Sequence, residues 1–372
     1  MNQKNALLSV YNKDGIVAFA QSLVSLGWNI FASGGTAKTL TDANVPVTDV
    51  AQLVGGGAIL GHRVVTLSRE VHAGLLATQT DTDLMELESL TIPFLHLVCC
   101  DLYPLKEAIE SPNATNESVI EKTDIGGPTM LRSAAKGKRI VIADPLDRAL
   151  VIHLLKEGDV PEEIRMQLAA KAEGIVANYC LQSARFHSSG NIDGQVGTLA
   201  LSCKYGENAY QAPAGLYATG SRDPLALDTF RVIQGTAPSY NNLCDLDRLL
   251  QTLTHIAAGF QKNFLYIPKI AIGVKHGNAC GVGVDETDPT KSLMRMIDGD
   301  PRALMGGLVI TNFGLNPELV EVLLTHGMPE GKRRLLDGVI VPSVREDALS
   351  ALKRKGDKCR IITNQALETE AC

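Results

Sequence analysis

The chain has 372 residues, of which 45% are hydrophobic and 20% charged, and its formal net charge is −6 at pH 7. A chain of this length exceeds what one hydrophobic core usually organises, so we expect two domains. The acidic balance gives no general electrostatic reason to bind nucleic acid or an anionic membrane, and no run of 18 apolar residues predicts a membrane span.

The N-terminus leads into a short apolar run without the pattern of a signal peptide, which indicates a cytoplasmic protein. Eight cysteines show no CxxC spacing and no tight cluster with histidine. This spacing argues against a zinc site and a redox pair, so we expect reduced, mostly buried thiols and no metal.

The first half predicts a strand at residues 6–10, a helix with apolar residues at helical spacing from Ile16 to Leu26, and a strand at 28–32. That second strand runs into Ser33, Gly34, Gly35 and Thr36 at the start of another helix. Free backbone N–H groups and a positive helix end attract an anion, so we predict a phosphate site there. An ordinary glycine turn after a strand is the alternative.

Residues 94–100 form a near-continuous apolar run, typical of a strand buried in a parallel sheet, and polar groups follow it at 101–104. Another glycine turn at 126–127 precedes a predicted helix that carries Lys136. Residues 139–143 predict a further strand, and 161–186 a long helix that packs through one apolar face.

The segment 188–195 is small and polar, and it predicts a linker before a second domain that starts near Thr198. The apolar strand at 268–274 then ends in Lys275 and His276, followed by glycines at 277, 281 and 283. A cation beside an imidazole can supply an anion stabiliser and a general base, and glycines let a backbone approach a ligand closely. The alternative is a solvated lysine and a histidine bonded to a loop. Strands and helices alternate throughout, so both halves should be α/β.

Nine short motifs occur in the order found in one enzyme family. They are LSV at 8–10, SGGTA at 33–37, LYP at 102–104, DIGGP at 124–128, AAK at 134–136, KYGEN at 204–208, SYNNL at 239–243, VKHGNACG at 274–281, and DP at 300–301 with GG at 306–307. Together they resemble the bifunctional AICAR transformylase/IMP cyclohydrolase family across the whole chain.

The resemblance implies a methylglyoxal-synthase-like IMP cyclohydrolase domain at 1–190. It also implies a cytidine-deaminase-like domain at 198–372, corresponding to the first of the two subdomains of the transformylase. The family's proteins are cytosolic homodimers that act on AICAR, FAICAR and IMP, with 10-formyl-tetrahydrofolate as co-substrate and no metal in the chemistry.

The resemblance also assigns site residues. Those of the formyl transfer are Lys275 and His276, with Lys204, Tyr205, Asn241 and Asn278 around the nucleotide and the reacting centre. Those of the ring closure are Tyr103, Asp124 and Lys136, with the phosphate held by Lys13, Ser33, Gly34, Gly35, Thr36 and Arg63.

The sequence departs from the family pattern at several positions. Val65 stands where the family has a lysine, Gly137 where it has an asparagine, and Lys204 where it usually has an arginine. These departures leave a second hypothesis, a nucleotide-binding paralogue that is catalytically silent or has a single activity. A third hypothesis is an unrelated hydrolase that uses Cys280 or His276.

Overall fold

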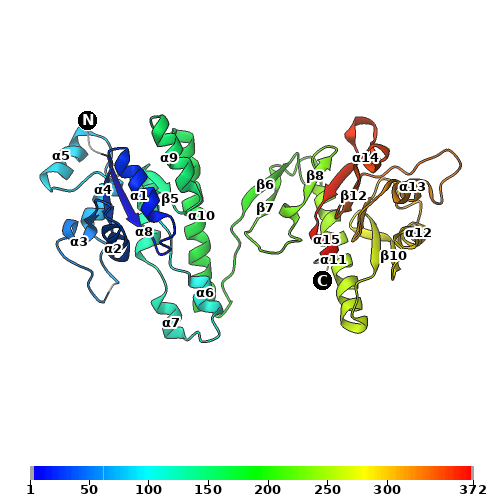
Figure 1. The fold of residues 1–372 in the computed structure, drawn as a ribbon, viewed down its shortest axis with the longest axis horizontal. Helices are drawn as coiled ribbons and strands as arrows, with labels where there is room; N and C mark the ends of the chain where they lie inside the picture. The colour runs from blue at the N-terminus through cyan, green and yellow to red at the C-terminus, as the bar shows by residue number, and fades with distance from the viewer. Residues whose placement is uncertain (1–3, 62, 370–372) are drawn as a thin grey trace. The chain divides into compact units, whose positions relative to one another are not determined.

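The computed structural model describes residues 4–61 and 63–369, and the chain divides into two compact units, residues 1–196 and 197–372 (Figure 1). Each unit contains its own sheet and its own hydrophobic core. Both are α/β, as the alternation of strands and helices predicts. In the part of the chain that the structure describes, no helix combines the length and hydropathy needed to cross a membrane.

The first unit is built on a five-stranded sheet in the order β3-β2-β1-β4-β5, in which every pairing is parallel. Its strands are β1 (Asn5–Ser9), β2 (Asn29–Ala32), β3 (Thr48–Asp49), β4 (Leu97–Cys100) and β5 (Ile140–Ile142). The strand order reverses between β1 and β4. In open sheets of this kind, ligands bind beyond the carboxyl ends of the strands at such a reversal.

Helices cover both faces of this sheet because successive side chains of each strand point to opposite sides. Leu8 and Cys99 pack with α1 (Ile16–Ser25), α2 (Gly34–Asp42) and α9 (Asp147–Glu157). Leu7 and Val98 pack on the other face with α4 (Arg69–Leu76), α8 (Gly126–Lys136) and α10 (Glu162–His187). The shorter helices of this unit are α3 (Val50–Leu53), α5 (Asp81–Ser89), α6 (Leu105–Glu110) and α7 (Asn116–Glu121).

The second unit contains a mixed six-stranded sheet in the order β10-β9-β11-β12-β13-β8, and β6 and β7 form a separate antiparallel pair. The strands are β6 (Thr198–Cys203), β7 (Ala214–Ala218), β8 (Arg231–Gln234), β9 (Lys269–Lys275), β10 (Asn278–Asp285), β11 (Leu308–Thr311), β12 (Gly338–Val341) and β13 (Arg360–Thr363). Only the β11-β12 and β12-β13 pairings are parallel.

Alternating side chains again divide this unit into two cores. Ile272 and Ile310 pack against α11 (Tyr240–Phe264), whereas Ala271 and Val309 pack against helices on the opposite face. Those helices are α12 (Pro289–Gly299), α13 (Pro317–Thr325) and α14 (Glu346–Leu352). Two 3-10 turns, η1 (Leu227–Thr229) and η2 (Lys355–Asp357), and a short α15 (Ala366–Thr369) complete the unit.

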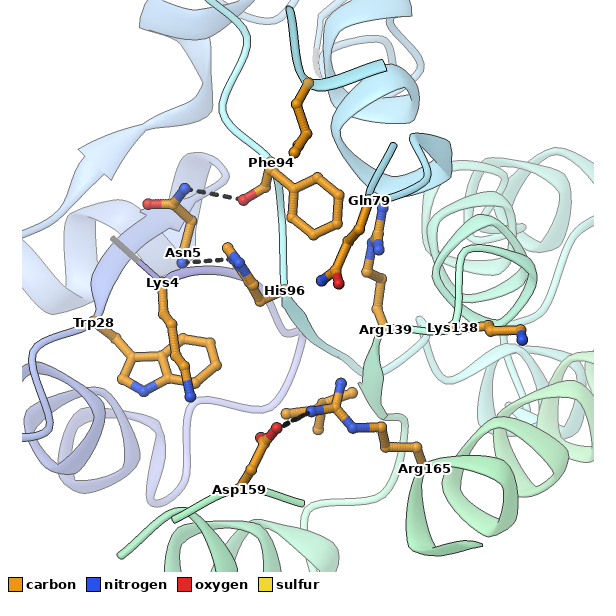
Figure 2. Close-up of a pocket in the computed structure, with 12 residues that line it drawn as sticks. Lys4, Asn5, Trp28, Gln79, Phe94, His96, Lys138, Arg139, Asp159 and Arg165 are labelled. Atoms are coloured by element: carbon orange, nitrogen blue, oxygen red, sulfur yellow. Dashed lines mark hydrogen bonds and ion pairs between the residues drawn. The ribbon is translucent and has the colours of Figure 1, made fainter. Parts of the chain in front are cut away.

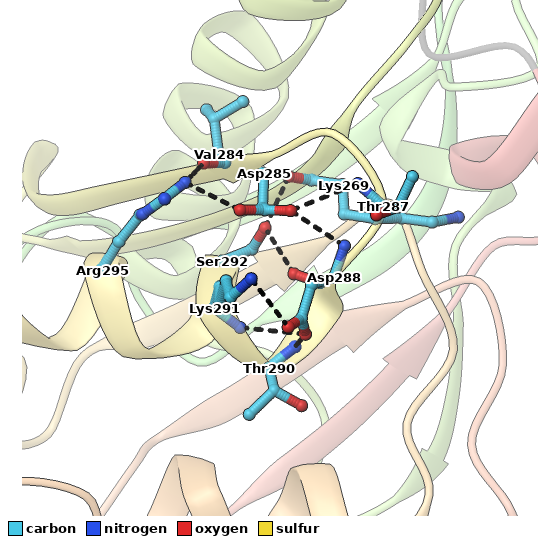
Figure 3. Close-up of polar contacts among 9 residues, drawn as sticks. All are labelled: Lys269, Val284, Asp285, Thr287, Asp288, Thr290, Lys291, Ser292 and Arg295. Carbon is cyan, nitrogen blue, oxygen red and sulfur yellow. Dashed lines mark hydrogen bonds and ion pairs between the residues drawn. The ribbon is translucent and has the colours of Figure 1, made fainter.

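Helix α12 is fixed to the β9–β10 hairpin at its N-terminus (Figure 3). Asp288 caps the helix by accepting hydrogen bonds from the backbone N–H groups of Thr290 (2.9 Å) and Lys291 (3.3 Å). The Ser292 hydroxyl donates to the Lys269 carbonyl at 2.7 Å. A capped helix tied to the neighbouring strand forms a rigid support for β10.

The glycines of β10 serve this packing, which corrects the expectation that they admit a ligand. A Cβ atom on Gly281 would lie 1.9 Å from the Met296 carbonyl oxygen, and one on Gly283 would lie 1.8 Å from that of Ser292. The opposing atoms belong to the backbone of α12, and Gly299 of that helix meets Gly281 in the same way. Backbone of α12 therefore occupies the space that the glycines leave.

Candidate functional site

The carboxyl edge of the N-terminal sheet carries Lys13 beside the N-terminus of α2. The Lys13 amine donates to the carbonyl oxygens of Val10 and Tyr11, and a Cβ atom on Gly35 would lie 4.0 Å from its Nζ. Burial lowers the pKa of Lys13, whereas the Asp101 carboxylate acts in the opposite direction. A half-buried cation thus lies beside the positive end of a helix, which is an environment that favours an anion.

The two hydroxyl groups beside the glycine turn are occupied within the protein. Thr36 is 1% exposed, and its Oγ1 accepts from the Val10 N–H at 3.1 Å and lies 3.2 Å from the Val10 carbonyl oxygen. Ser33 Oγ lies 2.7 Å from Ser9 Oγ. Ser33 is the N-cap of α2 but makes no side-chain cap hydrogen bond, so the backbone of Gly34 and Gly35 is the candidate anion-binding part of this turn.

Asp101 connects the ends of β1 and β4, where the strand order reverses. Its carboxylate accepts from the backbone N–H of Tyr11 and, at 3.1 Å, from that of Asn12. The Tyr11 ring meets the Tyr103 ring edge-on, with 5.5 Å between centroids. Two segments that are about 90 residues apart in sequence are thus held together beside Lys13.

Asp124 and Tyr103 lie together at the N-terminus of α8. Asp124 Oδ1 accepts from the Gly127 N–H at 2.8 Å. Burial raises the pKa of Asp124 against the effect of the backbone N–H groups of Gly127, Tyr103 and Gly126, and burial together with the Asp124 charge raises the pKa of Tyr103. The raised carboxyl pKa makes Asp124 a candidate proton donor or acceptor.

Tyr179 of α10 contacts the backbone of the segment that carries Asp124. Its hydroxyl accepts from the Asp124 N–H at 2.7 Å and donates to the Lys122 carbonyl at 3.2 Å. Burial raises the pKa of Tyr179 to about 12, so the hydroxyl stays protonated. The sequence pattern predicts only an apolar packing face for this helix. Helical periodicity cannot show that the Tyr179 hydroxyl contacts the loop of Asp124, which is 55 residues away in sequence.

The loop with Arg63 and Thr66 approaches the same helix end. The Arg63 guanidinium pairs with Glu121 of α7, at 2.7 Å between Nη2 and Oε2. Thr66 Oγ1 lies 2.7 Å from where a Cβ atom on Gly126 would be. Val65 is half-buried against the core beneath α4 and α8. The segment therefore brings a hydroxyl to the N-terminus of α8, and Arg63 is held by a carboxylate.

Lys136 is not brought to this edge. Asp124 precedes α8 and Lys136 is its last residue, so the length of the helix, about 16 Å, separates their backbones. The next residue, Gly137, lies against α4, where a Cβ atom would be 1.9 Å from the Leu75 carbonyl oxygen. An asparagine at this position does not fit the backbone as it stands.

In the second unit, Lys275 and His276 stand at a tight hairpin instead of a crevice at the end of a parallel strand. Lys275 pairs with Asn278, and the two intervening residues, His276 and Gly277, have φ angles of 52° and 74°. Positive φ at both positions is typical of a two-residue type I′ turn. The amide of Asn278 donates to the His276 carbonyl at 2.9 Å.

The hairpin is fixed from both faces of the sheet. The Gly277 N–H donates to Asp245 Oδ1 of α11 at 2.7 Å, and the Lys275 amine donates to the Met305 carbonyl at 2.6 Å. Burial raises the pKa of Asp245, while the His276 side chain acts to lower it. Lys275 thus extends toward the 300–307 turn, whereas His276 interacts with a carboxylate on α11.

Asn241 lies at the start of α11, the helix that also carries Asp245. Asn242 forms the capping box with Ser239, which leaves Asn241 exposed, one helical turn before Asp245. Lys204 and Tyr205 are exposed and directly follow β6. A cavity of about 360 Å³ between β7 and α11 is lined by residues that include Tyr240, Cys244, Arg248 and Gly277.

Cys280 does not have the environment of a nucleophile. Burial and the Asp300 charge raise the pKa of its thiol against the effect of Lys275, and a raised pKa disfavours the reactive thiolate. Of the cysteines in the described residues, Cys99, Cys100, Cys203 and Cys359 are buried and none is in a disulfide; Cys372 lies outside these residues. The thiol environment gives no support to a cysteine hydrolase.

Comparisons with known proteins cover most of the chain. A family model described as AICARFT/IMPCHase bienzyme matches residues 134–371, and one described as MGS-like domain matches residues 15–129. The chain is similar to the bifunctional purine biosynthesis protein PurH of Anoxybacillus flavithermus, with 36% identity over 365 residues, which are 95% of this chain and 67% of the relative.

Other similar proteins include PurH of Staphylococcus aureus strain Newman, with 34% identity over 355 residues, 95% of this chain and 66% of the relative. The chain thus spans about two thirds of the length of these curated relatives. The crystal structure of ForH is 38% identical, covers 50% of this chain and 99% of its own, and has a TM-score of 0.46.

Proposed function

Because the chain belongs to the AICARFT/IMPCHase bienzyme family, we propose that it carries out two consecutive steps of purine synthesis. The C-terminal unit, from residue 198, transfers a formyl group from 10-formyl-tetrahydrofolate to AICAR. The N-terminal unit, residues 1–190, closes the product FAICAR to IMP. The protein acts in the cytoplasm as a homodimer, and its other partners are these small nucleotides.

Formyl transfer needs a proton acceptor and a cation at one carbon atom. The 5-amino group of AICAR attacks the formyl carbon, the bond from that carbon to the folate nitrogen breaks, and the proton of the amine passes through His276 to the leaving nitrogen. The Lys275 ammonium stabilises the negative charge on the formyl oxygen. Lys204, Tyr205 and Asn241 hold the nucleotide, and Asn278 orients the reacting group.

The hydrogen bond between Asp245 and the Gly277 N–H is the observation that carries this half of the proposal. It fixes a turn of only two residues, so the positions of His276 and Lys275 are set by α11 and by the Met305 carbonyl. Chemistry that depends on atomic placement is favoured by such a rigid support.

Ring closure is intramolecular, so holding the substrate supplies much of the acceleration. The amide nitrogen of FAICAR attacks its own formyl carbon, and water leaves. Lys13 and the backbone of Gly34 and Gly35 hold the phosphate, while Asp124 and Tyr103 exchange protons with the reacting amide and the departing oxygen. Lys136 and Arg63 stay predictions, because the first lies at the far end of α8 and the second is paired with Glu121.

The decisive experiment is turnover of AICAR with 10-formyl-tetrahydrofolate by the purified chain, with FAICAR and IMP resolved as products. Lys275→Ala and His276→Ala should each abolish FAICAR formation, whereas Lys262→Ala and His255→Ala, on the helix α11, should not. FAICAR supplied directly should give IMP, and Asp124→Asn should slow that step alone. Binding of AICAR or IMP without turnover by the unaltered chain would overturn the enzymatic proposal.

A further inference from the structure

A second cavity lies at the amino ends of the strands of the N-terminal sheet, opposite the glycine turn at their carboxyl ends. It has a volume of about 610 Å³ and is lined by residues at or just before the amino ends of β1, β2, β4 and β5, among them Lys4, Trp28, His96 and Arg139 (Figure 2). Its size is in the range of small-molecule pockets. Because all five strands are parallel, this cavity and the glycine turn after β2 are at opposite edges of the sheet.

Positive charge is in excess around this cavity. Its lining contains four fixed cations, Lys4, Lys138, Arg139 and Arg165, and one carboxylate, Asp159. That carboxylate is held by Arg165, whose Nη2 lies 2.8 and 2.9 Å from its two oxygens. Figure 2 shows Lys4 and Arg165 entering the cavity from different elements, with Lys138 at its periphery. Three positive charges therefore have no counter-charge among the described residues of the wall.

Arg139 is the residue of this wall that most strongly favours an anionic ligand. It is 5% exposed, its guanidinium lies 3.9 Å above the Phe94 ring, and within the described residues it donates only to the carbonyl oxygens of Gly74 and Ala77. Its Nε has no hydrogen-bond partner, and no carboxylate of the described residues pairs with it. Buried arginines are usually paired with an acid. Burial and the Arg165 charge lower its pKa to about 10, so it stays charged at pH 7.

His96 adds a neutral donor to this wall. Its Nδ1 lies 3.1 Å from the backbone nitrogen of Asn5, which can only donate, so Nδ1 accepts and Nε2 carries the ring proton. Burial and the charges of Arg139, Lys4 and Arg165 lower the pKa of His96 to about 4, so the ring is neutral at pH 7. Two kinds of donor, charged amines and a fixed imidazole N–H, thus surround one cavity.

We propose that this cavity binds a phosphate monoester dianion, at the edge of the sheet opposite the site assigned to ring closure. A doubly charged anion matches the excess of positive charge better than a single carboxylate does. Inorganic phosphate, a sugar phosphate and a nucleoside monophosphate offer the same chemistry, and the test distinguishes them. The site is independent of whether the chain turns over AICAR.

The chain provides its own reporter, because Trp28 is its single tryptophan and lines the cavity, with the Lys4 amine 5.5 Å from the centre of the ring. The full chain is titrated with inorganic phosphate, ribose 5-phosphate and IMP at constant ionic strength, and tryptophan emission is followed. A saturable change is expected with at least one of the three, and the relative affinities identify the source. Lys13→Ala, which alters the other edge, should leave this affinity unchanged.

Two variants are expected to change the affinity for phosphate in opposite directions. Lys4→Ala should weaken binding about tenfold, and Asp159→Asn, which removes the only carboxylate of the lining, should strengthen it several-fold. Lys156→Ala removes the same charge from an exposed position of α9 and should change the affinity less than about twofold. An emission change that potassium chloride reproduces, or an affinity that neither Lys4→Ala nor Asp159→Asn alters, would overturn the proposal.

Discussion

Asp245 accepts a hydrogen bond from the backbone N–H of Gly277, and this contact joins α11 to the hairpin that carries Lys275 and His276. The two residues are 32 positions apart in sequence. Lys275 pairs directly with Asn278, so the turn between them has only two residues. The hydrogen bond from Gly277 therefore fixes the whole turn.

Replacing Asp245 should therefore affect catalysis as well as folding. Asp245→Ala removes the acceptor and should lower kcat for formyl transfer about 100-fold, since small misplacements of reacting groups are costly. It should cost about 1–3 kcal/mol of unfolding free energy. Asp245→Asn keeps an acceptor oxygen and should stay within about fivefold of the original kcat. Equal rates for the original chain and Asp245→Ala would contradict this role.

Glycine 283 should be required for stability. In Gly283→Ala the new methyl group meets the Ser292 carbonyl, so α12 must move, and we expect a loss of about 3 kcal/mol in urea unfolding. Gly259→Ala is the matched control, because nothing lies within 4 Å of its Cβ position on α11. Gly259→Ala should raise the free energy of unfolding by about 0.5–1 kcal/mol. If Gly283→Ala weakened ligand binding while leaving unfolding unchanged, the glycine would instead serve a ligand.

Restoring a lysine at position 65 should improve ring closure. Val65 is half-buried near the N-terminus of α8, and a lysine stem can cover the same apolar surface while its amine reaches the substrate. We expect Val65→Lys to convert FAICAR to IMP about tenfold faster. Val65→Met has similar length without charge and serves as the control. A rate for Val65→Lys no higher than for Val65→Met would show that the charge is not needed.

His96 should make the protein less stable in mild acid. Its pKa is about 4 in the folded chain and 6.5 in the unfolded chain, so the unfolded state binds the proton first. The stabilising contribution is complete above pH 6.5 and is lost as the pH falls toward 4. With solvent screening we expect a loss of about 1–2 kcal/mol. Urea unfolding of the original chain and His96→Gln at pH 7 and pH 4.5 measures it: the variant should lose less stability by this amount.

The sequence predicts elements whose signal is local. The apolar run ending at Cys100 contains β4, and Pro161 directly precedes α10. Apolar periodicity and helix-start residues are properties of a single segment, so they can be read without a partner.

Features that depend on two segments could not be predicted in the same way. The sequence does not predict β10, because its glycines weaken the strand pattern. The backbone atoms of α12 that require these glycines belong to Ser292 and Met296, which lie well outside the strand in sequence. The hydrogen bond from Asp124 to Tyr179 and the cation-lined cavity around Arg139 join distant segments. The two-residue turn at His276 was the one local signal that could have indicated a hairpin.

The contact of Gly281 and Gly283 with α12 has a consequence for how relatives of this protein diverge. Main-chain atoms oppose these glycines, so no substitution elsewhere restores room for a side chain. A relative without formyl transfer would still need both glycines for the packing of α12, whereas Lys275 and His276 would be free to change. In a relative of this protein, the two glycines therefore indicate the same fold, whereas Lys275 and His276 indicate the same chemistry.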